Sequence, residues 1–158
     1  MIEFRRATLE DVEVLAKLRV EMLFETKHSE ADLRSLLYGN TVHYLCEAMA
    51  DASYLAWVAE EDGQIVAMGG LTFYRLPPND WCPNGHTAYL SAMYTKPAHR
   101  KKGIAKRLLE LLMREAKDHG CERVLLHATT MGRQLYETAG FWDSADSMAY
   151  YPYMQNHG

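Results

Sequence analysis

A short cationic turn that contains a glycine is the stretch of this sequence whose residues most clearly suggest chemistry. It reads Arg100-Lys101-Lys102-Gly103-Ile104-Ala105 and lies between a strand-like run, Ala88 to Thr95, and a helical run, Ile104 to His119. A strand that ends at such a turn and continues as a helix directs free backbone N–H groups and the positive end of the helix dipole at one point. The turn therefore predicts an anion site, and a phosphate is the anion that suits it best.

One glycine in a turn is weak evidence by itself, because His99 to Lys102 could equally be a solvated basic run or a nucleic-acid patch. Gly103 and Ala105 favour the phosphate site, since small residues at the start of a helix let a ligand approach the backbone amides closely. The sequence contains neither GxxxxGK(S/T) nor GxGxxG. Nucleotide-binding sites of those two types are thereby excluded.

The turn and a second stretch, Leu135-Tyr136-Glu137-Thr138-Ala139-Gly140-Phe141, together resemble the signatures of the GNAT superfamily of acetyl-CoA-dependent N-acetyltransferases. The turn is similar to the family's pyrophosphate-binding pattern Q/R-x-x-G-x-G/A, and Met93-Tyr94-Thr95-Lys96-Pro97 resembles the strand that leads into it. The second stretch is similar to the family's LYE-x-x-GF ending. The likeness covers the whole chain in element order and is specific from Ala88 to Phe141.

The resemblance implies where the co-substrate, acetyl-CoA, would bind, and it implies no metal. The residues around the CoA pyrophosphate would be Arg100, Lys101, Lys102, Gly103, Ile104, Ala105 and Lys106, mostly through their main-chain N–H groups. Met93, Tyr94 and Thr95 would pair their main chain with the pantetheine arm, in a gap where their strand splays from the next one. Thr129 stands where many members carry asparagine and could donate one hydrogen bond to the cofactor.

The resemblance also implies two catalytic roles. The Met93 N–H would polarise the thioester carbonyl, as an oxyanion hole does. Tyr136 would protonate the departing CoA thiolate, which suits a phenol of reference pKa about 10 and a thiol of pKa about 8.5. An enzyme of this kind would transfer acetyl to a primary amine of a small molecule or peptide, by direct attack in a ternary complex.

The general base is not visible in the motifs. An amine of pKa about 10 must lose a proton before it attacks, so a base or a water chain is required. Many family members carry a glutamate early on the central strand, and Tyr89 occupies roughly that position here. A water-relayed path is expected, and the other candidate groups are Glu25, His28, His86, Ser91 and His127.

The elements that must position these residues are visible in the hydrophobic pattern of the first half. Ile2 to Ala7 alternates as a strand, and Val12, Leu15, Leu18 and Met22 form one stripe of a helix that should fray near residues 25–29. A weaker helical pattern covers Glu30 to Ala50, with an interruption expected at Gly39-Asn40. Two strands, Tyr54 to Glu60 and Gln64 to Tyr74, should form a hairpin through the Asp62-Gly63 turn.

The second half predicts a strand to Thr95, the helix from Ile104, and a loop at residues 77–85 long enough to cover a site. A short strand, Val124 to Ala128, a short helix, Met131 to Ala139, and a last strand, Phe141 to Tyr151, should follow. This order predicts an α/β fold in one domain, residues 1–158, with a partly parallel sheet. The resemblance implies a mixed, mostly antiparallel sheet of six to seven strands, splayed at the centre and flanked by about four helices.

Composition restricts the remaining classes of protein. The chain has 158 residues, 48% of them hydrophobic, which suits one core without stabilising metals or disulfides. Its formal charge of -4 argues against a general nucleic-acid binder. Cys46, Cys82 and Cys121 suggest neither a disulfide framework nor a zinc site. Without an apolar run of roughly 18 residues or a signal-peptide core, we expect a soluble cytoplasmic protein with no membrane partner.

Three alternatives stay open at this level. A non-catalytic acyl-CoA-binding sensory module would keep the turn and lack turnover. A nucleic-acid contact at His99 to Lys102 would weaken steeply with salt, although the acidic composition disfavours it. Cys82 or Cys121 could be a covalent nucleophile, but neither has a histidine partner in a recognisable motif. An exposed edge at Phe141 to Tyr151 suggests a possible homodimer by strand pairing.

Overall fold

The computed structural model describes residues 1–28, 30–144 and 147–154, which form two compact units, Met1–His127 and Ala128–Gly158. The first unit holds a sheet of five strands. Its strands are β1 (Ile2–Arg6), β2 (Tyr54–Glu61), β3 (Gln64–Arg75), β4 (His86–Thr95) and β5 (Arg123–Leu125), and its helices are α1 (Val12–Leu23), α2 (Ala31–Ala50) and α3 (Ile104–Asp118). The second unit contains α4 (Arg133–Thr138). Short 3-10 turns cover Leu9–Asp11 and Pro97–His99.

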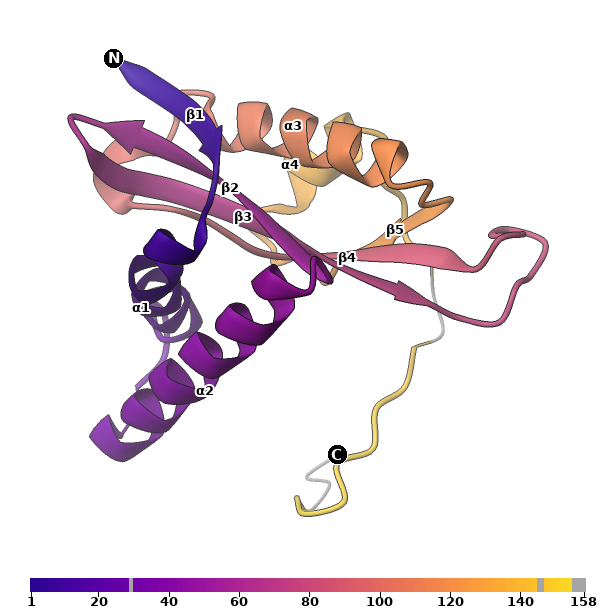
Figure 1. The fold of residues 1–158 in the computed structure, drawn as a ribbon, viewed down its shortest axis with the longest axis horizontal. Helices are drawn as coiled ribbons and strands as arrows, with labels where there is room; N and C mark the ends of the chain where they lie inside the picture. The colour runs from indigo at the N-terminus through magenta and orange to yellow at the C-terminus, as the bar shows by residue number, and fades with distance from the viewer. Residues whose placement is uncertain (29, 145–146, 155–158) are drawn as a thin grey trace. The chain divides into compact units, whose positions relative to one another are not determined.

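The strands lie in the order β1-β2-β3-β4-β5 (Figure 1). The first four are antiparallel, and β5 pairs with β4 in parallel. The predicted hairpin is confirmed: Asp62 and Gly63 both have positive φ, 52° and 77°, as a tight two-residue hairpin turn requires. The sheet is therefore mixed and mostly antiparallel, as the resemblance implied.

Helices cover both faces of this sheet, with α1 and α2 on one face and α3 on the other (Figure 1). Alternation along the strands sends neighbouring side chains to opposite faces. Val58 packs with Leu15 and Leu18 of α1, whereas the adjacent Ala59 packs with Ile104 and Leu108 of α3. The sheet is thus buried on two sides, and the two cores differ in the helices that close them.

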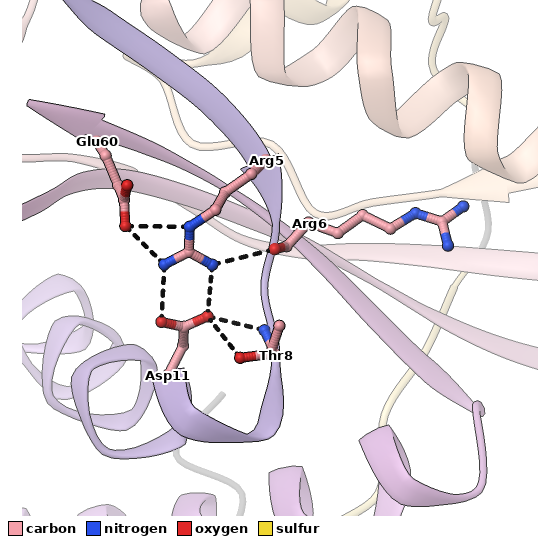
Figure 2. A network of polar contacts seen from close by, with 5 residues as sticks. All are labelled: Arg5, Arg6, Thr8, Asp11 and Glu60. Atoms are coloured by element: carbon pink, nitrogen blue, oxygen red, sulfur yellow. Dashed lines mark hydrogen bonds and ion pairs between the residues drawn. The ribbon is translucent and has the colours of Figure 1, made fainter. Parts of the chain in front are cut away.

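A charged network fixes the start of α1 to the sheet edge (Figure 2). Arg5 of β1 donates hydrogen bonds to both carboxylate oxygens of Asp11, at 2.7 and 2.9 Å, and to Glu60 of β2. Asp11 also accepts the Thr8 backbone N–H at 2.7 Å, which caps the turn that leads into the helix. The hydrogen bonds from Arg5 hold the pKa of Asp11 below its usual value despite burial.

The next residue of β1 serves the opposite face of the sheet. Arg6 donates to Glu115, a carboxylate on α3 that is only 5% exposed. Trp57 of β2 donates its indole N–H to the other oxygen of the same group at 3.1 Å. A buried carboxylate needs such partners, because an unpaired charge in the interior is costly. Arg5 and Arg6 therefore connect the sheet edge to α1 and α3 respectively.

Three predictions about elements were wrong. The helix α2 runs through Gly39-Asn40 without a break. The sheet has five strands in the described part of the chain, not six to seven. No strand forms at residues 141–144 or 147–151, and the rest of the predicted strand Phe141 to Tyr151, residues 145–146, lies outside the described residues. The described residues of this segment therefore show no strand through which two copies could pair.

Candidate active site

The middle of β4 departs from regular strand geometry. Its register with β3 shifts so that two residues, Ala92 and Met93, lie opposite the single residue Gly69. Ala92 has φ of 57°, in the left-handed region that L side chains rarely adopt. Such a bulge removes a residue from the ladder and redirects the backbone around it. The Met93 backbone, predicted to bind the thioester carbonyl, therefore lies at the irregular point of the strand.

Because Gly69 and Gly70 have no side chains, the side chains of other residues can lie over β3 at this bulge, on both faces of the sheet. A Cβ at position 69 would lie 2.4 Å from Met93 Sδ and 2.7 Å from a methyl group of Leu112 on α3. A Cβ at position 70 would lie 1.8 Å from the hydroxyl oxygen of Tyr54. Tyr54 of β2 thus extends across β3 to the side of β4, where its hydroxyl interacts with Ser91.

The outer edge of β4 is paired along only part of its length. Within the described residues, pairing with β5 covers Thr87 to Tyr89 and ends at the partner Leu125. Leu90 to Thr95 continue along β4 without a β5 partner, while Ala67 and Met68 of β3 still pair with Thr95 and Tyr94 on the other edge. The main chain of Met93 to Thr95 is therefore open on the β5 side, as the predicted splay requires.

The turn into α3, residues 100–106, has the backbone geometry of an anion site. Lys101 and Gly103 have φ of 63° and 80°, and Gly103 is the N-cap of α3. Among the described residues, no acceptor is bonded to the backbone N–H groups from Lys101 to Lys106; the first helical bond of this region runs from the Arg107 N–H to the Gly103 carbonyl. Nothing lies within 4 Å of a Cβ built on Gly103. We call residues 100–106 the α3 turn.

The side chain of Arg100 turns back from the α3 turn toward β4. Its Nε donates to the Thr95 carbonyl at 2.9 Å, and its guanidinium lies 5.5 Å from the ring centroid of Tyr94. It also forms an ion pair with Glu25, which follows α1. Burial, with Glu25 and Glu21 nearby, raises the pKa of Tyr94. Arg100 is accordingly a brace between three segments, whereas Lys101, Lys102 and Lys106 are exposed.

A pocket of about 390 Å³ lies on the face of the sheet covered by α1 and α2, and we call it the α1–α2 pocket. Its floor includes Tyr89, Ser91 and Ala92 of β4, next to the bulge. The other residues that line it are Leu15, Arg19, Leu23, Leu37, Asn40, Thr41, Tyr44, Leu45, Tyr54, Met68 and Thr72. Its volume is that of a small-molecule site.

The groups considered as general bases lie in different parts of the structure, and only some of them line the α1–α2 pocket. The hydroxyl group of Tyr89, at the floor of the pocket, forms a hydrogen bond of 2.5 Å with Nδ1 of His127. His127 is exposed. Ser91 also lines the pocket. Glu25 is paired with Arg100, and His28 is exposed in the loop after α1. His86 lines a different, smaller pocket of about 260 Å³ at the other end of β4.

The second unit holds Tyr136 in a short helix with local support. The Thr129 hydroxyl accepts the Gly132 N–H at 3.1 Å, so Thr129 caps the turn before α4 and keeps its own O–H free to donate. A Cβ at position 132 would lie 3.1 Å from the Tyr136 ring, which is a tight approach. Phe141 packs edge-on against Tyr136, with 5.8 Å between ring centroids. Burial raises the pKa of Tyr136, so the phenol stays protonated at neutral pH.

Several pocket residues carried no signal in the sequence. Arg19, Tyr44 and Tyr54 come from three elements, and each stands in a pattern that a surface helix or a strand explains. The aromatic residues that line the α1–α2 pocket are Tyr44, Tyr54 and Tyr89, whereas Phe73 and Tyr74 line the smaller pocket. Cys82 is fully buried, which argues against a nucleophilic role. In the sequence, the Gly69-Gly70 pair was the one sign that side chains of other residues lie over this part of β3.

Comparison with known proteins agrees with this geometry. The family model described as "Acetyltransferase (GNAT) family" matches residues 13–141. The uncharacterized N-acetyltransferase YjgM of Escherichia coli (strain K12) is 29% identical over 87% of this chain and 80% of its own length. The thialysine N-epsilon-acetyltransferase of Bos taurus is 28% identical, over 78% of this chain and 70% of its own.

Solved structures show the same likeness. A predicted acetyltransferase from Clostridium acetobutylicum, crystallised with acetyl-CoA, superposes with a TM-score of 0.86 at 29% identity, over 96% of both chains. A GCN5-related N-acetyltransferase from Ralstonia eutropha JMP134 gives 0.85 at 30% identity, over 95% of this chain and 97% of that one.

The chain belongs to the GNAT family of acetyltransferases. It is an N-acetyltransferase that uses acetyl-CoA as its co-substrate, and nothing in the comparisons supports a non-catalytic sensor. Among the described residues, no group of three or more His, Cys, Asp or Glu side chains is placed to hold a metal ion. No described helix is long and apolar enough to cross a membrane.

Proposed function

We propose that this enzyme transfers the acetyl group to a primary amine bound in the α1–α2 pocket, by direct attack on the thioester. One observation carries the proposal: Tyr89, Ser91 and Ala92 line this pocket and directly precede Met93 on β4. An amine in the pocket would therefore approach the strand at the bulge, where the thioester carbonyl is expected. Holding both reactants at one strand supplies much of the rate, because a bimolecular encounter becomes a local one.

The α3 turn is the proposed site of the CoA pyrophosphate. Its free N–H groups, from Lys101 to Lys106, and the start of α3 would bind the negative charge. The residues assigned to it are Arg100, Lys101, Lys102, Gly103, Ile104, Ala105 and Lys106. The side chain of Arg100 would act indirectly, since it already braces Thr95 and Glu25. Tyr94 and Thr95 would pair their main chain with the pantetheine arm along the open edge of β4, and Thr129 would donate one further hydrogen bond.

The transfer itself would use Met93 and Tyr136. As the amine nitrogen bonds to the carbonyl carbon, negative charge collects on the oxygen, and the Met93 N–H would stabilise it. The C–S bond then breaks, and Tyr136 would give its proton to the leaving sulfur. The bonded nitrogen would lose its extra proton to water, and the phenol of Tyr136 would regain a proton from water. A phenol of ordinary pKa about 10 is protonated at neutral pH, so Tyr136 has a proton to donate.

Tyr89 and His127 form the proposed route for the amine proton. The substrate ammonium would donate to the Tyr89 oxygen while Tyr89 passes its own proton to Nδ1 of His127. The exposed imidazole would then release a proton to water. We expect Tyr89→Phe to slow transfer to a strongly basic alkylamine about 10- to 100-fold. An amine whose conjugate acid has a pKa below the assay pH should be far less affected, since its nitrogen is already unprotonated before the attack.

Two further expectations belong to this proposal. A cytoplasmic location remains a prediction, supported by three free cysteines, of which Cys46 is exposed. A homodimer also stays a prediction, to be checked by analytical ultracentrifugation.

The proposal is tested by measuring thiol release from acetyl-CoA with a panel of primary amines, together with the mass of each acceptor. We expect release that depends on the amine and an acceptor heavier by one acetyl group. Tight CoA binding without amine-dependent release from any amine would favour a sensory module instead. Acetyl transfer to the protein's own cysteine would contradict direct attack.

A further inference from the structure

The α1–α2 pocket has an unusual distribution of charge for a site that receives an amine. Among the described residues that line it, Arg19 is the only one with a formal charge. The polar remainder is neutral, and its members are Asn40, Thr41, Tyr44, Tyr54, Thr72, Tyr89 and Ser91. A pocket that selected cations would present carboxylates. This lining instead presents one cation and several neutral hydrogen-bonding groups.

Arg19 also lacks a counter-ion within the described residues. No hydrogen bond or ion pair in that part of the chain joins its guanidinium to a carboxylate. Five other arginines form ion pairs with carboxylates in the structure, namely Arg5, Arg6, Arg100, Arg107 and Arg133. Because Arg19 is half-buried, its charge is only partly solvated. An anion that enters the pocket would supply the missing partner.

The tyrosines that share the pocket with Arg19 do not neutralise its charge. Tyr54 interacts electrostatically with Arg19, yet burial raises the pKa of Tyr54 to about 12, so the phenol is neutral. The Tyr44 hydroxyl is already bonded to the Thr72 hydroxyl at 3.0 Å. These groups can donate or accept hydrogen bonds, but they carry no charge. The positive charge of Arg19 is therefore available to a ligand.

We propose that the acceptor is an amine that also carries a carboxylate, with the carboxylate bound by Arg19 and the amine directed to β4. The proposal rests on the proposed function, since it names the substrate class of the same pocket. A planar guanidinium matches a carboxylate with two parallel hydrogen bonds. A phosphate dianion would call for more than one cation. The leucines of α1 and α2, Leu15, Leu23, Leu37 and Leu45, would contact an aliphatic stem between the two ends.

The test compares ε-aminocaproate with ε-aminocaproamide, which share one amine and one stem and differ in the carboxylate charge. For the wild type, kcat/KM should be about tenfold to a hundredfold higher for the acid, the range expected for a charged hydrogen-bonded pair. In Arg19→Met this preference should disappear, while KM for acetyl-CoA stays unchanged. Lys17→Met removes an exposed cation from the same helix, so it should keep the preference. An aminoalkyl phosphate serves as a second anion, and a preference for it over the carboxylate would overturn the assignment.

Calorimetric binding of the same two amines, in the presence of CoA, separates this inference from the proposed function. Turnover of both amines at equal rates, or a preference that survives Arg19→Met, would overturn the carboxylate assignment and leave N-acetyl transfer intact. Tighter binding of the acid that depends on Arg19, without any acetyl transfer, would support the carboxylate site and contradict the proposed reaction. Equal binding of acid and amide by the wild type would again refute the role of Arg19.

Discussion

The α3 turn and the α1–α2 pocket, which we propose as the sites of the two substrates of one reaction, are made from different parts of the chain. The turn presents backbone N–H groups from consecutive residues, and its shape depends on the positive φ of Lys101 and Gly103. The pocket presents side chains from α1, α2, β2, β3 and β4. A backbone site depends on a short local sequence, whereas a side-chain site depends on how distant elements pack. The first is therefore common to many proteins, and the second gives an enzyme its own acceptor.

The largest effect that would test this contrast is expected from Gly103→Glu. The substitution places a strained residue and a negative charge at the N-terminus of α3, where the pyrophosphate would bind. We expect CoA affinity to fall about a hundredfold or more, measured by calorimetry. Gly120→Glu is the matched control, because Gly120 follows the other end of α3 with φ of 76° and equally open space. Normal CoA binding by Gly103→Glu would refute the site.

The next effect concerns chemistry rather than binding. Tyr136→Phe should lower kcat about 100- to 1,000-fold, since the departing thiolate loses its proton donor. The Kd of CoA should change little. Steady-state kinetics and calorimetry on the same preparation separate the two quantities. Near-normal turnover would remove Tyr136 from the catalytic role, and a matching loss of CoA affinity would make it a binding residue.

A smaller and more specific effect is expected from the two neighbouring glycines of β3. In Gly70→Ala the new methyl would meet the rigid ring of Tyr54, so we expect the free energy of unfolding to fall by about 1–3 kcal/mol. The KM of the amine should rise while CoA binding is kept. Gly69→Ala meets the flexible ends of Met93 and Leu112, and it should cost less and spare the amine site. Denaturant unfolding and amine kinetics check both variants. Equal losses of stability and of amine affinity in the two variants would contradict the assignment of Gly70 to the amine-binding face and Gly69 to the other face.

The smallest effect on chemistry is expected from Asp11→Asn, which breaks the network of Figure 2. The variant should unfold about 1–2 kcal/mol more easily at neutral pH, with kcat nearly unchanged. Arg5 keeps the pKa of Asp11 below its unfolded value of about 3.9, so this stabilisation is present above that pH and is lost as the pH falls. The difference between wild type and variant should therefore shrink in acid. A constant difference in urea unfolding at each pH would rule out the ion pair as its source.

The sequence predicted the α3 turn well because its signals are local. Gly103 supplies the positive φ, Ile104 begins an amphipathic helix, and the Asp62-Gly63 hairpin is equally short-range. Local helix propensity led to a wrong prediction where tertiary packing determines the structure. Gly39 costs a helix about 1 kcal/mol, yet α2 continues through it because Leu45 and Ala48 bury their side chains further along. The pocket could not be predicted, since nothing in residues 19, 54 and 91 individually indicates that they meet.

The contrast between the α3 turn and the α1–α2 pocket is tested most directly by a crystal structure of the enzyme with CoA and ε-aminocaproate. We predict the pyrophosphate on the N–H groups of the α3 turn, the sulfur beside Met93 and within hydrogen-bond reach of Tyr136, and the amine in the α1–α2 pocket at the floor formed by β4. A pyrophosphate bound away from the α3 turn, or an amine on the face of the sheet covered by α3, would contradict this account.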